Sequence, residues 1–540
     1  MSRITASRFP AAVVTALALL AVLTLAAWMR LVGVAWGLPY LYDLDEPYFV
    51  VPAFKVLASR DLNPHWFGHP GTTTIYSNTI AFGLEGARAL VAGDIERASN
   101  LGQVFWSEPS RFYLIARLVA VLFGVGTVAL TYRLARRFLD VPAALAAALL
   151  LAVAPLHVEY SQIARTDAQH VFLITLFTLF CVRLAQEKRL TDYVWAGATL
   201  GLAIACKYTS VVTTIGLIAA FVVDRRQAVG LTTPWWQPVT LATAACVAGA
   251  LIGSPYILLD FGQVLQDLRT EGRASHLSAT SMGFLPALAL YVRTLTVDNF
   301  GPAALACALA GLAVWGRAGK ATAPLLALLA GYLLFISTLK LQWARWAIPV
   351  LPLLCVLLAS SLELAGAVLA RSAPMRLGLR AASALLITGC AVVALQQSLS
   401  SNAERRGEDN RTHANHWIES HIAPGSRLAI ERYTPQPDKR RYGVYRAEQD
   451  GQLSRDDAPN IHASTSGALA SLLDPDALRK AGISHVVLGN TLDRMEAEPL
   501  KYAREIATYQ RILASATLVY ETSPEPGHNR GNHVRIYRLD

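Results

Sequence analysis

The sequence predicts a polytopic α-helical membrane protein with a small extracytoplasmic α/β domain at its C-terminal end. Three observations predict this class. Only 16% of the 540 residues are charged, whereas a soluble protein carries about a quarter. Apolar segments of membrane-spanning length recur through most of the first 400 residues, and charged residues become dense only from Asn402 onward. We therefore expect a transmembrane domain over 1–400 and a soluble domain over 401–540.

The apolar segments predict about eleven spans. The first run, 11–38, follows Arg3 and Arg8 and is longer than the core of a secretory signal, which predicts an uncleaved spanning helix. Lys207 interrupts two short runs, which we interpret as a tight hairpin with Lys207 at its outer end. The further segments are 111–133, 140–156, 168–185, 192–206, 208–223, 238–256, 300–316, 321–338, 346–370 and 379–397.

Positive residues predict the orientation. With the N-terminus inside, fifteen Lys and Arg residues fall in the inner segments and six in the opposite short loops, as the positive-inside rule requires. An odd number of spans then places the C-terminal domain outside, which in a bacterium is the periplasm. The long segments, 39–110 and 257–299, also lie on the outer side, and 74–90 is apolar enough for an interfacial helix. Elaborate loops on one face predict that the protein acts there.

The soluble domain is predicted to mix helices and strands. A helix is expected over 413–421, after Thr412, and a second over 499–516. Short apolar or β-branched runs predict strands at 428–431, 485–488, 517–521 and 534–537. No catalytic motif appears in this domain.

Composition also excludes several classes of protein. The net charge of +10 comes from Arg and Lys at the ends of apolar segments, not from a basic stripe, so we do not expect a nucleic-acid partner. All six cysteines lie inside or at the edge of apolar segments, which argues against a disulfide framework or a cysteine zinc site. They are Cys181, Cys206, Cys246, Cys307, Cys355 and Cys390.

The first outer loop opens with carboxylates. Asp43, Asp45 and Glu46 follow the first span directly, where acids at a membrane surface usually have a functional partner. Neighbouring carboxylates raise each other's pKa, which suits a general base. The structural alternative is a solvated cap, in which Glu46 and Pro47 begin a helix. The residues alone leave both interpretations open.

A second acidic and basic group follows in the loop 157–167, which carries Glu159, Arg165 and Asp167. Asp167 could lie near the first-loop acids, or it could pair with Arg165 and fix the loop. Further along, Lys207 and Arg345 stand at the ends of apolar runs. These cations either extend to lipid headgroups or bind the phosphate of a lipid-borne substrate.

His65 and His69 are spaced four residues apart, as in some metal sites. Pro and Gly occupy this stretch, however, so the two side chains do not share a helix face. Contacts with phosphate or sugar, or simple loop packing, fit the segment better than zinc. No closed set of metal ligands is visible, and we expect no metal and no other cofactor.

Together these motifs resemble the lipid-carrier-dependent glycosyltransferases of the GT-C superfamily, in particular the protein O-mannosyltransferase and aminoarabinose transferase group. Asp45 and Glu46 stand where that family has an acidic pair after its first span, and Asp167 stands where it has a second outer-loop acid. Lys207-Tyr208 follows a span containing Gly201, and Arg345-Trp346 precedes Pro349 and Pro352, similar to an Arg-Tyr followed by prolines in the family. One motif departs, since the family's Lys-Pro-Pro, which contacts the donor phosphate, appears here as His69-Pro70-Gly71, so that either His69 is protonated near the phosphate or the role has moved.

The resemblance implies an inverting transfer of a sugar from a polyprenyl-phosphate donor to a hydroxyl or amine of an acceptor lipid, glycan or protein. It implies a bacterial inner-membrane enzyme whose active site faces the periplasm. The implied roles are as follows: Asp45 is the base; Glu46 and Asp167 position the acceptor or the base; Lys207, Arg345 and His69 hold the donor phosphate; and Asp43, Tyr48, Glu159 and Arg165 contact acceptor or sugar.

Two other functions remain open from the sequence. A transporter or flippase for a polyprenyl-linked lipid predicts internal repeats and charged or broken helices near the bilayer middle, whereas the acids here stand at the predicted outer surface. An O-antigen-type polymerase would explain the long outer loops but not the acids directly after the first span.

Overall fold

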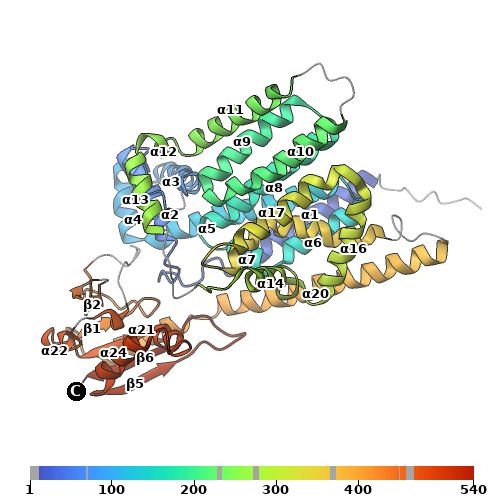
Figure 1. The fold of residues 1–540 in the computed structure, drawn as a ribbon. Coiled ribbons are helices and arrows are strands. Elements are labelled where there is room, and N and C mark those ends of the chain that lie inside the picture. The colour runs from blue at the N-terminus through green and yellow to red at the C-terminus, as the bar shows by residue number, and fades with distance from the viewer. Residues whose placement is uncertain are drawn as a thin grey trace, which may run out of the picture. The chain divides into compact units, whose positions relative to one another are not determined.

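The computed structural model describes residues 11–68, 71–227, 234–271, 279–364, 372–448, 450–457, 468–472 and 474–539. The chain forms two compact units (Figure 1). The helical unit comprises Met1–Val32, Pro52–Ala92 and Ile115–Leu399, and the mixed unit comprises Gly33–Val51, Gly93–Leu114 and Ser400–Asp540. The sequence-based division at 400/401 stays a prediction.

The helical unit is a bundle of apolar helices, and three helices (α2, α5 and α20) continue into the mixed unit. Its α-helices are α1 (Ala11–Leu31), α2 (Pro47–Ser59), α3 (Thr72–Ala92), α5 (Pro109–Ala135), α6 (Val141–Val153), α7 (Pro155–Tyr160), α8 (Thr166–Glu187), α9 (Leu190–Cys206), α10 (Thr214–Gln227), α11 (Trp236–Gly253), α12 (Tyr256–Leu259), α13 (Phe261–Glu271), α14 (Phe284–Leu295), α15 (Val297–Phe300), α16 (Ala303–Ala318), α17 (Ala323–Ser337), α18 (Leu351–Ser360) and α20 (Ala373–Arg406). Its 3₁₀ turns are η2 (Tyr208–Thr213), η3 (Gly319–Thr322), η4 (Ala344–Val350) and η5 (Ser361–Glu363).

Eight helical stretches in the described part of the chain are long and apolar enough to cross a membrane. Each segment that the sequence predicted as a span contains a helix, but α6 and α9 are shorter apolar helices and 303–337 is one continuous stretch. The protein is therefore a multi-pass helical membrane protein, while the count of eleven spans and the orientation stay predictions. The eight stretches are Ala11–Leu31, Pro109–Ala135, Thr166–Glu187, Tyr208–Arg225, Trp236–Gly253, Ala303–Ser337, Ala344–Glu363 and Ala373–His421.

The first helix is shorter than predicted, because α1 ends at Leu31 and not near 38. Gly33 and Gly37 follow with φ of 84° and 76°, a left-handed conformation that ends a helix and that glycine adopts without a steric penalty. The apolar residues up to Leu38 continue in turns.

Close helix contacts build the bundle around α8 and α9. In Figure 1, α9 packs against α11 and also against α8. A Cβ on Gly201 would lie 2.0 Å from the carbonyl oxygen of Cys246, and one on Gly249 would lie 2.3 Å from that of Ala198. Glycines spaced four apart, 197 and 201 on α9 and 249 and 253 on α11, thus let the two backbones touch, as small residues do in membrane helix pairs.

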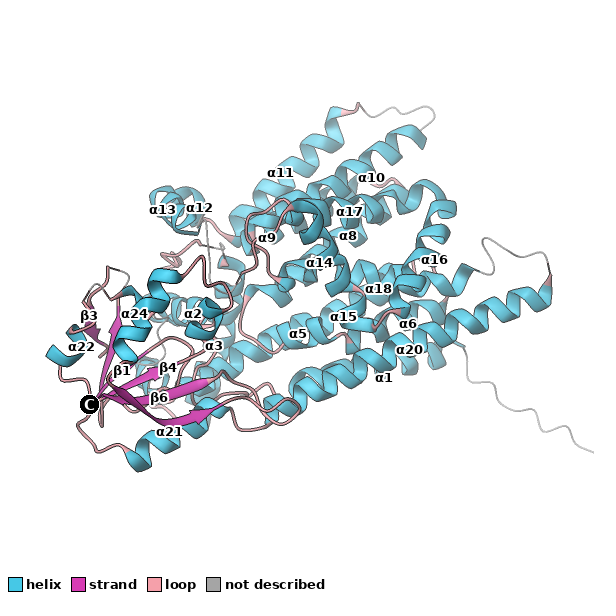
Figure 2. Ribbon diagram, turned by 60° about the horizontal axis from the view of Figure 1, so that its bottom comes forward, coloured by secondary structure: helices cyan, strands magenta, loops and turns pink. Residues whose placement is uncertain are grey.

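The mixed unit is built on a six-stranded sheet of order β3-β2-β1-β4-β6-β5, drawn in magenta in Figure 2. The central strand β1 is parallel to β2 and to β4, and the remaining pairs are antiparallel. The strands are β1 (Arg427–Ile430), β2 (Gly443–Ala447), β3 (Leu453–Arg455), β4 (His485–Leu488), β5 (Ala516–Thr522) and β6 (Val534–Leu539). The helices are η1 (Ala98–Asn100), α4 (Leu101–Ser107), α21 (Asn410–His421), η6 (Leu469–Ser471), α22 (Ala477–Lys480), α23 (Thr491–Glu496) and α24 (Ala503–Leu513).

Two helices cover opposite faces of this sheet. Leu428 and Ile430 of β1 pack with Ile418 of α21 in one apolar core. Side chains alternate between the two faces of a strand, and Glu431, next after Ile430, accepts a hydrogen bond from the Tyr509 hydroxyl of α24. The central strand β1 is thus covered on both faces of the sheet. The helix α21 begins at Asn410, three residues earlier than predicted: Asp409 is the N-cap, and its carboxylate accepts the Arg411 N–H at 3.0 Å.

Candidate active site

A compact charged group lies where α8 begins and α9 ends. Asp167 stands in the first turn of α8, where the helix dipole favours a carboxylate. Its Oδ1 pairs with the Lys207 ammonium at 3.0 Å, and its Oδ2 lies 3.6 Å from the Arg165 Nε. The Lys207 backbone is extended between α9 and η2, which directs the chain out of the helix at this point. All three side chains are nearly buried.

A buried arginine, Arg30, contacts the short helix α7, which carries Glu159. The Arg30 guanidinium donates to the Leu151 and Ala152 carbonyls at 3.3 and 3.0 Å, and so caps the C-terminal end of α6. It also lies 2.6 Å from His157 Nδ1. Burial, and then the Arg30 charge, hold the pKa of His157 well below its usual range, so the imidazole stays neutral and Nδ1 accepts.

The pKa shift of the Tyr160 phenol indicates which other charged side chains lie near this group. Burial, and then the charges of Glu159 and Asp167, raise the pKa of this phenol, Arg165 and Arg345 act in the opposite direction, and the net result is a pKa of about 12. The Arg345 guanidinium also stacks over the Trp343 ring, 5.3 Å from its centroid. All four charged residues therefore lie within electrostatic range of a single hydroxyl.

We call this group the Asp167 cluster, and it consists of Glu159, Tyr160, Arg165, Asp167, Lys207 and Arg345. With three cations and two carboxylates, the cluster carries a surplus of positive charge. A site of this kind is suited to an anion such as a phosphate ester. The Arg165–Asp167 pair that sequence reasoning offered as a structural alternative is present, and Lys207 joins it.

The first-loop acids form a second group, which lies in the mixed unit. The Asp43 carboxylate accepts the Asp45 N–H at 2.9 Å, and both side chains are half-buried. Glu46 is fully buried, and its carbonyl accepts the Val50 N–H at 3.1 Å as α2 begins at Pro47. A helix thus begins directly after Glu46, as the structural alternative predicted, although Glu46 is buried and not solvated. Tyr48, in the first turn of α2, is half-buried.

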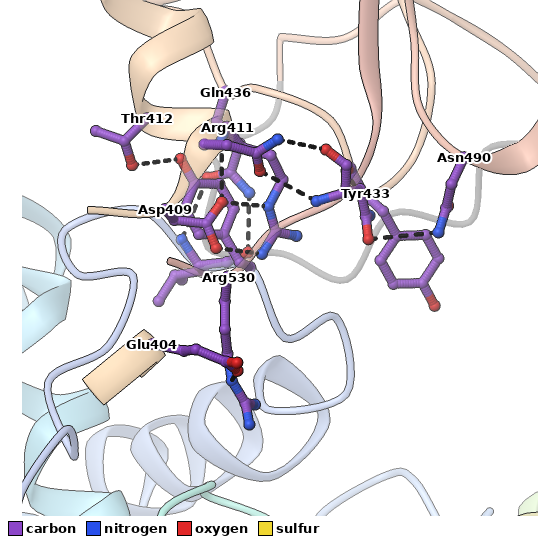
Figure 3. Close-up of polar contacts among 12 residues, drawn as sticks. Glu404, Asp409, Arg411, Thr412, Tyr433, Gln436, Asn490 and Arg530 are labelled. Carbon is purple, nitrogen blue, oxygen red and sulfur yellow. Dashed lines mark hydrogen bonds and ion pairs between the residues drawn. The ribbon is translucent and has the colours of Figure 1, made fainter. Parts of the chain in front are cut away.

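Residues of the C-terminal tail hold the chain just before these acids. Gln436 Oε1 accepts the Leu41 N–H at 3.3 Å, and Gln436 Nε2 donates to the Leu41 carbonyl at 2.9 Å. The Tyr42 hydroxyl lies 2.9 Å from that of Thr412, and the Arg411 guanidinium lies 3.9 Å from the Tyr42 ring centroid. The Arg411 guanidinium in turn donates two hydrogen bonds to the Asp409 carboxylate, at 2.7 and 2.8 Å (Figure 3). Sequence reasoning missed all of these tail residues, because no local pattern links them to a loop almost 400 residues earlier.

The predicted site residues thus fall into two groups. The structure brings Glu159, Arg165, Asp167, Lys207 and Arg345 together in the helical unit, and Asp43, Asp45, Glu46 and Tyr48 along one segment at the start of α2. That the two groups share one pocket stays a prediction. His69 lies outside the described residues, as does Pro70. Gly71, which ends that motif, donates its N–H to the Cys206 carbonyl at 3.2 Å, next to Lys207 in the chain.

The His65 side chain is engaged with acids of its own surroundings. Its Nε2 lies 3.1 Å from the Asp61 carboxylate, and its Nδ1 lies 3.9 Å from that of Asp260. Over the described residues, no group of three or more His, Cys, Asp or Glu side chains is placed to hold a metal ion.

Several known proteins resemble this chain in sequence or in fold. Residues 113–252 match the family described as dolichyl-phosphate-mannose-protein mannosyltransferase, and this stretch contains most of the Asp167 cluster, including Asp167 and Lys207. No curated protein matches the sequence. The crystal structure of ArnT from Cupriavidus metallidurans bound to undecaprenyl phosphate matches with a TM-score of 0.52 and 13% identity over 97% of each chain.

The apo state of the same protein gives a TM-score of 0.53 with 16% identity over 98% of each chain. The oligosaccharyltransferase from Archaeoglobus fulgidus gives 0.49 with 15% identity, over 95% of this chain and 72% of that one. The resemblance to GT-C proteins of the ArnT and mannosyltransferase group, which the motifs suggested, is thus confirmed at the level of the fold.

Proposed function

We propose that this protein is a membrane glycosyltransferase that moves a sugar from a polyprenyl-phosphate carrier to a hydroxyl or amine of an acceptor. The observation that carries the proposal is the cation-rich Asp167 cluster at the ends of α8 and α9. It is supported by the fold likeness to ArnT, whose crystal structure holds undecaprenyl phosphate. The positive-inside pattern supports an inner-membrane protein whose reaction takes place on the periplasmic side.

The donor phosphate is assigned to Lys207 and Arg345, with His69 as a third contact. Phosphate is a leaving group that needs positive charge more than it needs a proton, and cations fixed in a buried site supply that charge without reorganisation. Asp167 holds the Lys207 ammonium in place at 3.0 Å, while Trp343 supports the Arg345 guanidinium.

Asp45 is assigned as the base. It takes the proton from the acceptor O–H or N–H, the acceptor atom bonds to the anomeric carbon, and the bond from that carbon to the phosphate oxygen breaks. The polyprenyl phosphate leaves with the electron pair, and attack from the opposite face inverts the anomeric centre. Glu46 and Asp167 position the acceptor or the base, and Asp43, Tyr48, Glu159 and Arg165 contact acceptor or sugar.

The test is transfer of radiolabelled sugar from a set of polyprenyl-phosphate donors to a panel of acceptors by purified protein. Asp45→Asn should lower turnover by about 10²–10⁴-fold, with expression and membrane insertion unchanged. Asp61→Asn is the matched control, because Asp61 is an exposed aspartate of the same loop that pairs with His65. Near wild-type turnover in the Asp45 variant would remove the proposed base.

A further inference from the structure

Two acids of the short helices α12 and α13 bond to the first outer loop. The Asp260 carboxylate, between the two helices, accepts a hydrogen bond from Asn63 Nδ2 at 2.8 Å. The Asp267 carboxylate of α13 accepts the Phe67 N–H at 2.6 Å. These bonds join residues 197 and 200 positions apart in the chain. The predicted outer segment 257–299 therefore begins with a helical stretch that holds the loop at two points.

The sequence of α13 directs Asp267 toward the protein. Val264, one turn earlier on the same face of the helix, is buried. Gln263 Nε2 donates to Asp267 Oδ1 at 2.8 Å, while the Phe67 N–H bonds to the other oxygen, Oδ2. Each carboxylate oxygen thus accepts from a donor of its own. The exposed large apolar residues of α13 are Phe261, Leu265 and Leu268.

The backbone of Phe67 is held at both of its polar groups. Its N–H is bonded to Asp267, and its carbonyl accepts from the Tyr208 hydroxyl at 3.1 Å. The Phe67 side chain is fully buried. Side chains from α13 and from η2 therefore meet at one residue of the first outer loop.

The same part of the loop is bonded to the chain on both sides of Lys207. Tyr208, which donates to Phe67, comes directly after Lys207, and Cys206 comes directly before it. The Cys206 carbonyl accepts the Gly71 N–H at 3.2 Å. The Lys207 side chain between these two contacts is only 12% exposed. The loop thus helps to set where the Lys207 ammonium lies and how far water reaches it.

We propose that Asp267 is a positioning residue for the donor-phosphate site, and that it acts by holding the Phe67 peptide and, through it, the loop beside Lys207. The inference rests on the proposed function, because that function assigns the donor phosphate to Lys207. A cation attracts phosphate more strongly where water is excluded, so a loosened loop weakens donor binding. Asp267 itself contacts the loop and not the reacting atoms.

The experiment compares Asp267→Asn with the wild-type protein. Asparagine keeps the size of the side chain but offers one acceptor oxygen to two donors. The change should raise the KM for donor about tenfold and leave kcat within about twofold, because it removes binding that substrate and transition state share. Asp267→Glu keeps both acceptor oxygens and should recover part of the loss. Asp298→Asn is the matched control, because Asp298 is an exposed aspartate of the same segment that pairs with Arg293.

Two kinetic results would overturn the inference and leave the proposed function standing. The first is a wild-type KM for donor in Asp267→Asn. The second is a lower kcat at unchanged KM, because Asp267 would then act on the transition state alone.

A readout without turnover separates the two proposals. Purified protein in detergent is titrated with farnesyl phosphate and with farnesol. Asp267→Asn should bind farnesyl phosphate about tenfold more weakly than the wild-type protein and bind farnesol equally well, because only the phosphate meets Lys207. This result, with no sugar transfer from any donor by the wild-type protein, would defeat the proposed function and preserve the role of Asp267. Equal loss of both ligands would indicate a general disturbance of the fold and overturn the inference.

Discussion

Among single residues, Lys207 uses its charge in two interactions. Its ammonium pairs with Asp167 at 3.0 Å, and both side chains are nearly buried. In the proposed reaction the same ammonium also meets the donor phosphate. Since breaking a buried pair leaves an uncompensated charge, a simple deletion of Lys207 confounds stability with function.

We therefore predict different outcomes for single and paired changes at this site. Lys207→Gln should destabilise the protein by about 3–5 kcal/mol, because Asp167 stays charged and loses its closest cation. Adding Asp167→Asn should restore much of the stability but not the affinity for donor. Thermal unfolding in detergent and the KM for donor measure the two effects. A double variant with a wild-type KM would show that Lys207 does not bind the phosphate.

Asp456 provides a pH-dependent prediction for the tail. Its carboxylate accepts from Lys439 at 2.8 Å and from Arg446 at 2.6 Å. Burial opposes ionisation, but the hydrogen bonds to the two cations outweigh it and hold the pKa of Asp456 below its usual value. The folded state thus binds this proton less tightly than the unfolded state. The resulting stability is present above the unfolded pKa of about 4 and is lost as the pH falls below it.

Asp456→Asn should accordingly lower the stability of the tail at pH 7 by about 2 kcal/mol, and by progressively less as the pH falls below about 4. The measurement is thermal unfolding followed by circular dichroism across this range, with the exposed Asp476→Asn as control. A constant difference between variant and wild type at all pH values would contradict the assignment.

At the scale of elements, the contact between α9 and α11 sets the position of Lys207. The helix α9 ends at Cys206, immediately before Lys207, and its glycines let the backbone of α11 approach. Gly201→Ala should therefore push the helices apart, destabilise the unit by about 1–3 kcal/mol through overpacking, and raise the KM for donor.

Gly389→Ala on α20 is the matched control. A Cβ at that position meets nothing within 4 Å, and alanine favours the helix. The two variants are compared by thermal unfolding and donor KM. Equal stability and equal KM would mean that the close contact does not position the cluster.

The sequence could predict those elements that arise from a local pattern of residues, and it could not predict those that depend on tertiary contacts. Each predicted span contains a helix, and strands were predicted near β1, β4, β5 and β6, because apolar periodicity is a local signal. The strands β2 and β3 were not predicted, since both are short and β3 reads Leu-Ser-Arg, with no apolar alternation. The ends of α1 and α21 depended on glycine conformation and cap choice, which tertiary structure decides.

The same distinction holds for the candidate site. Asp167, Arg165, Lys207 and Arg345 were proposed from motifs in order, and the structure gathers them in one cluster. The Gln436–Leu41 hydrogen bonds could not be predicted, because they join residues almost 400 positions apart that only the folded chain brings together.

At the scale of the whole molecule, the proposed topology places the acids of the first loop and the tail on the same side of the membrane. We predict that a membrane-impermeant maleimide labels Asp45→Cys and the exposed Lys501→Cys from the outside of intact spheroplasts. Lys188→Cys, an exposed position in a predicted inner loop, should react only after permeabilisation. Labelling of Lys188→Cys without permeabilisation would reverse the topology.

The central claim is that the donor is chemically cleaved and not merely moved across the bilayer. The most direct measurement follows radiolabelled polyprenyl-phosphate sugar in proteoliposomes supplied with acceptor. The account predicts that label passes to the acceptor while free polyprenyl phosphate accumulates, and that Asp45→Asn abolishes both changes. Intact donor that appears in the opposite leaflet, with no label on any acceptor, would contradict it and identify the protein as a lipid transporter.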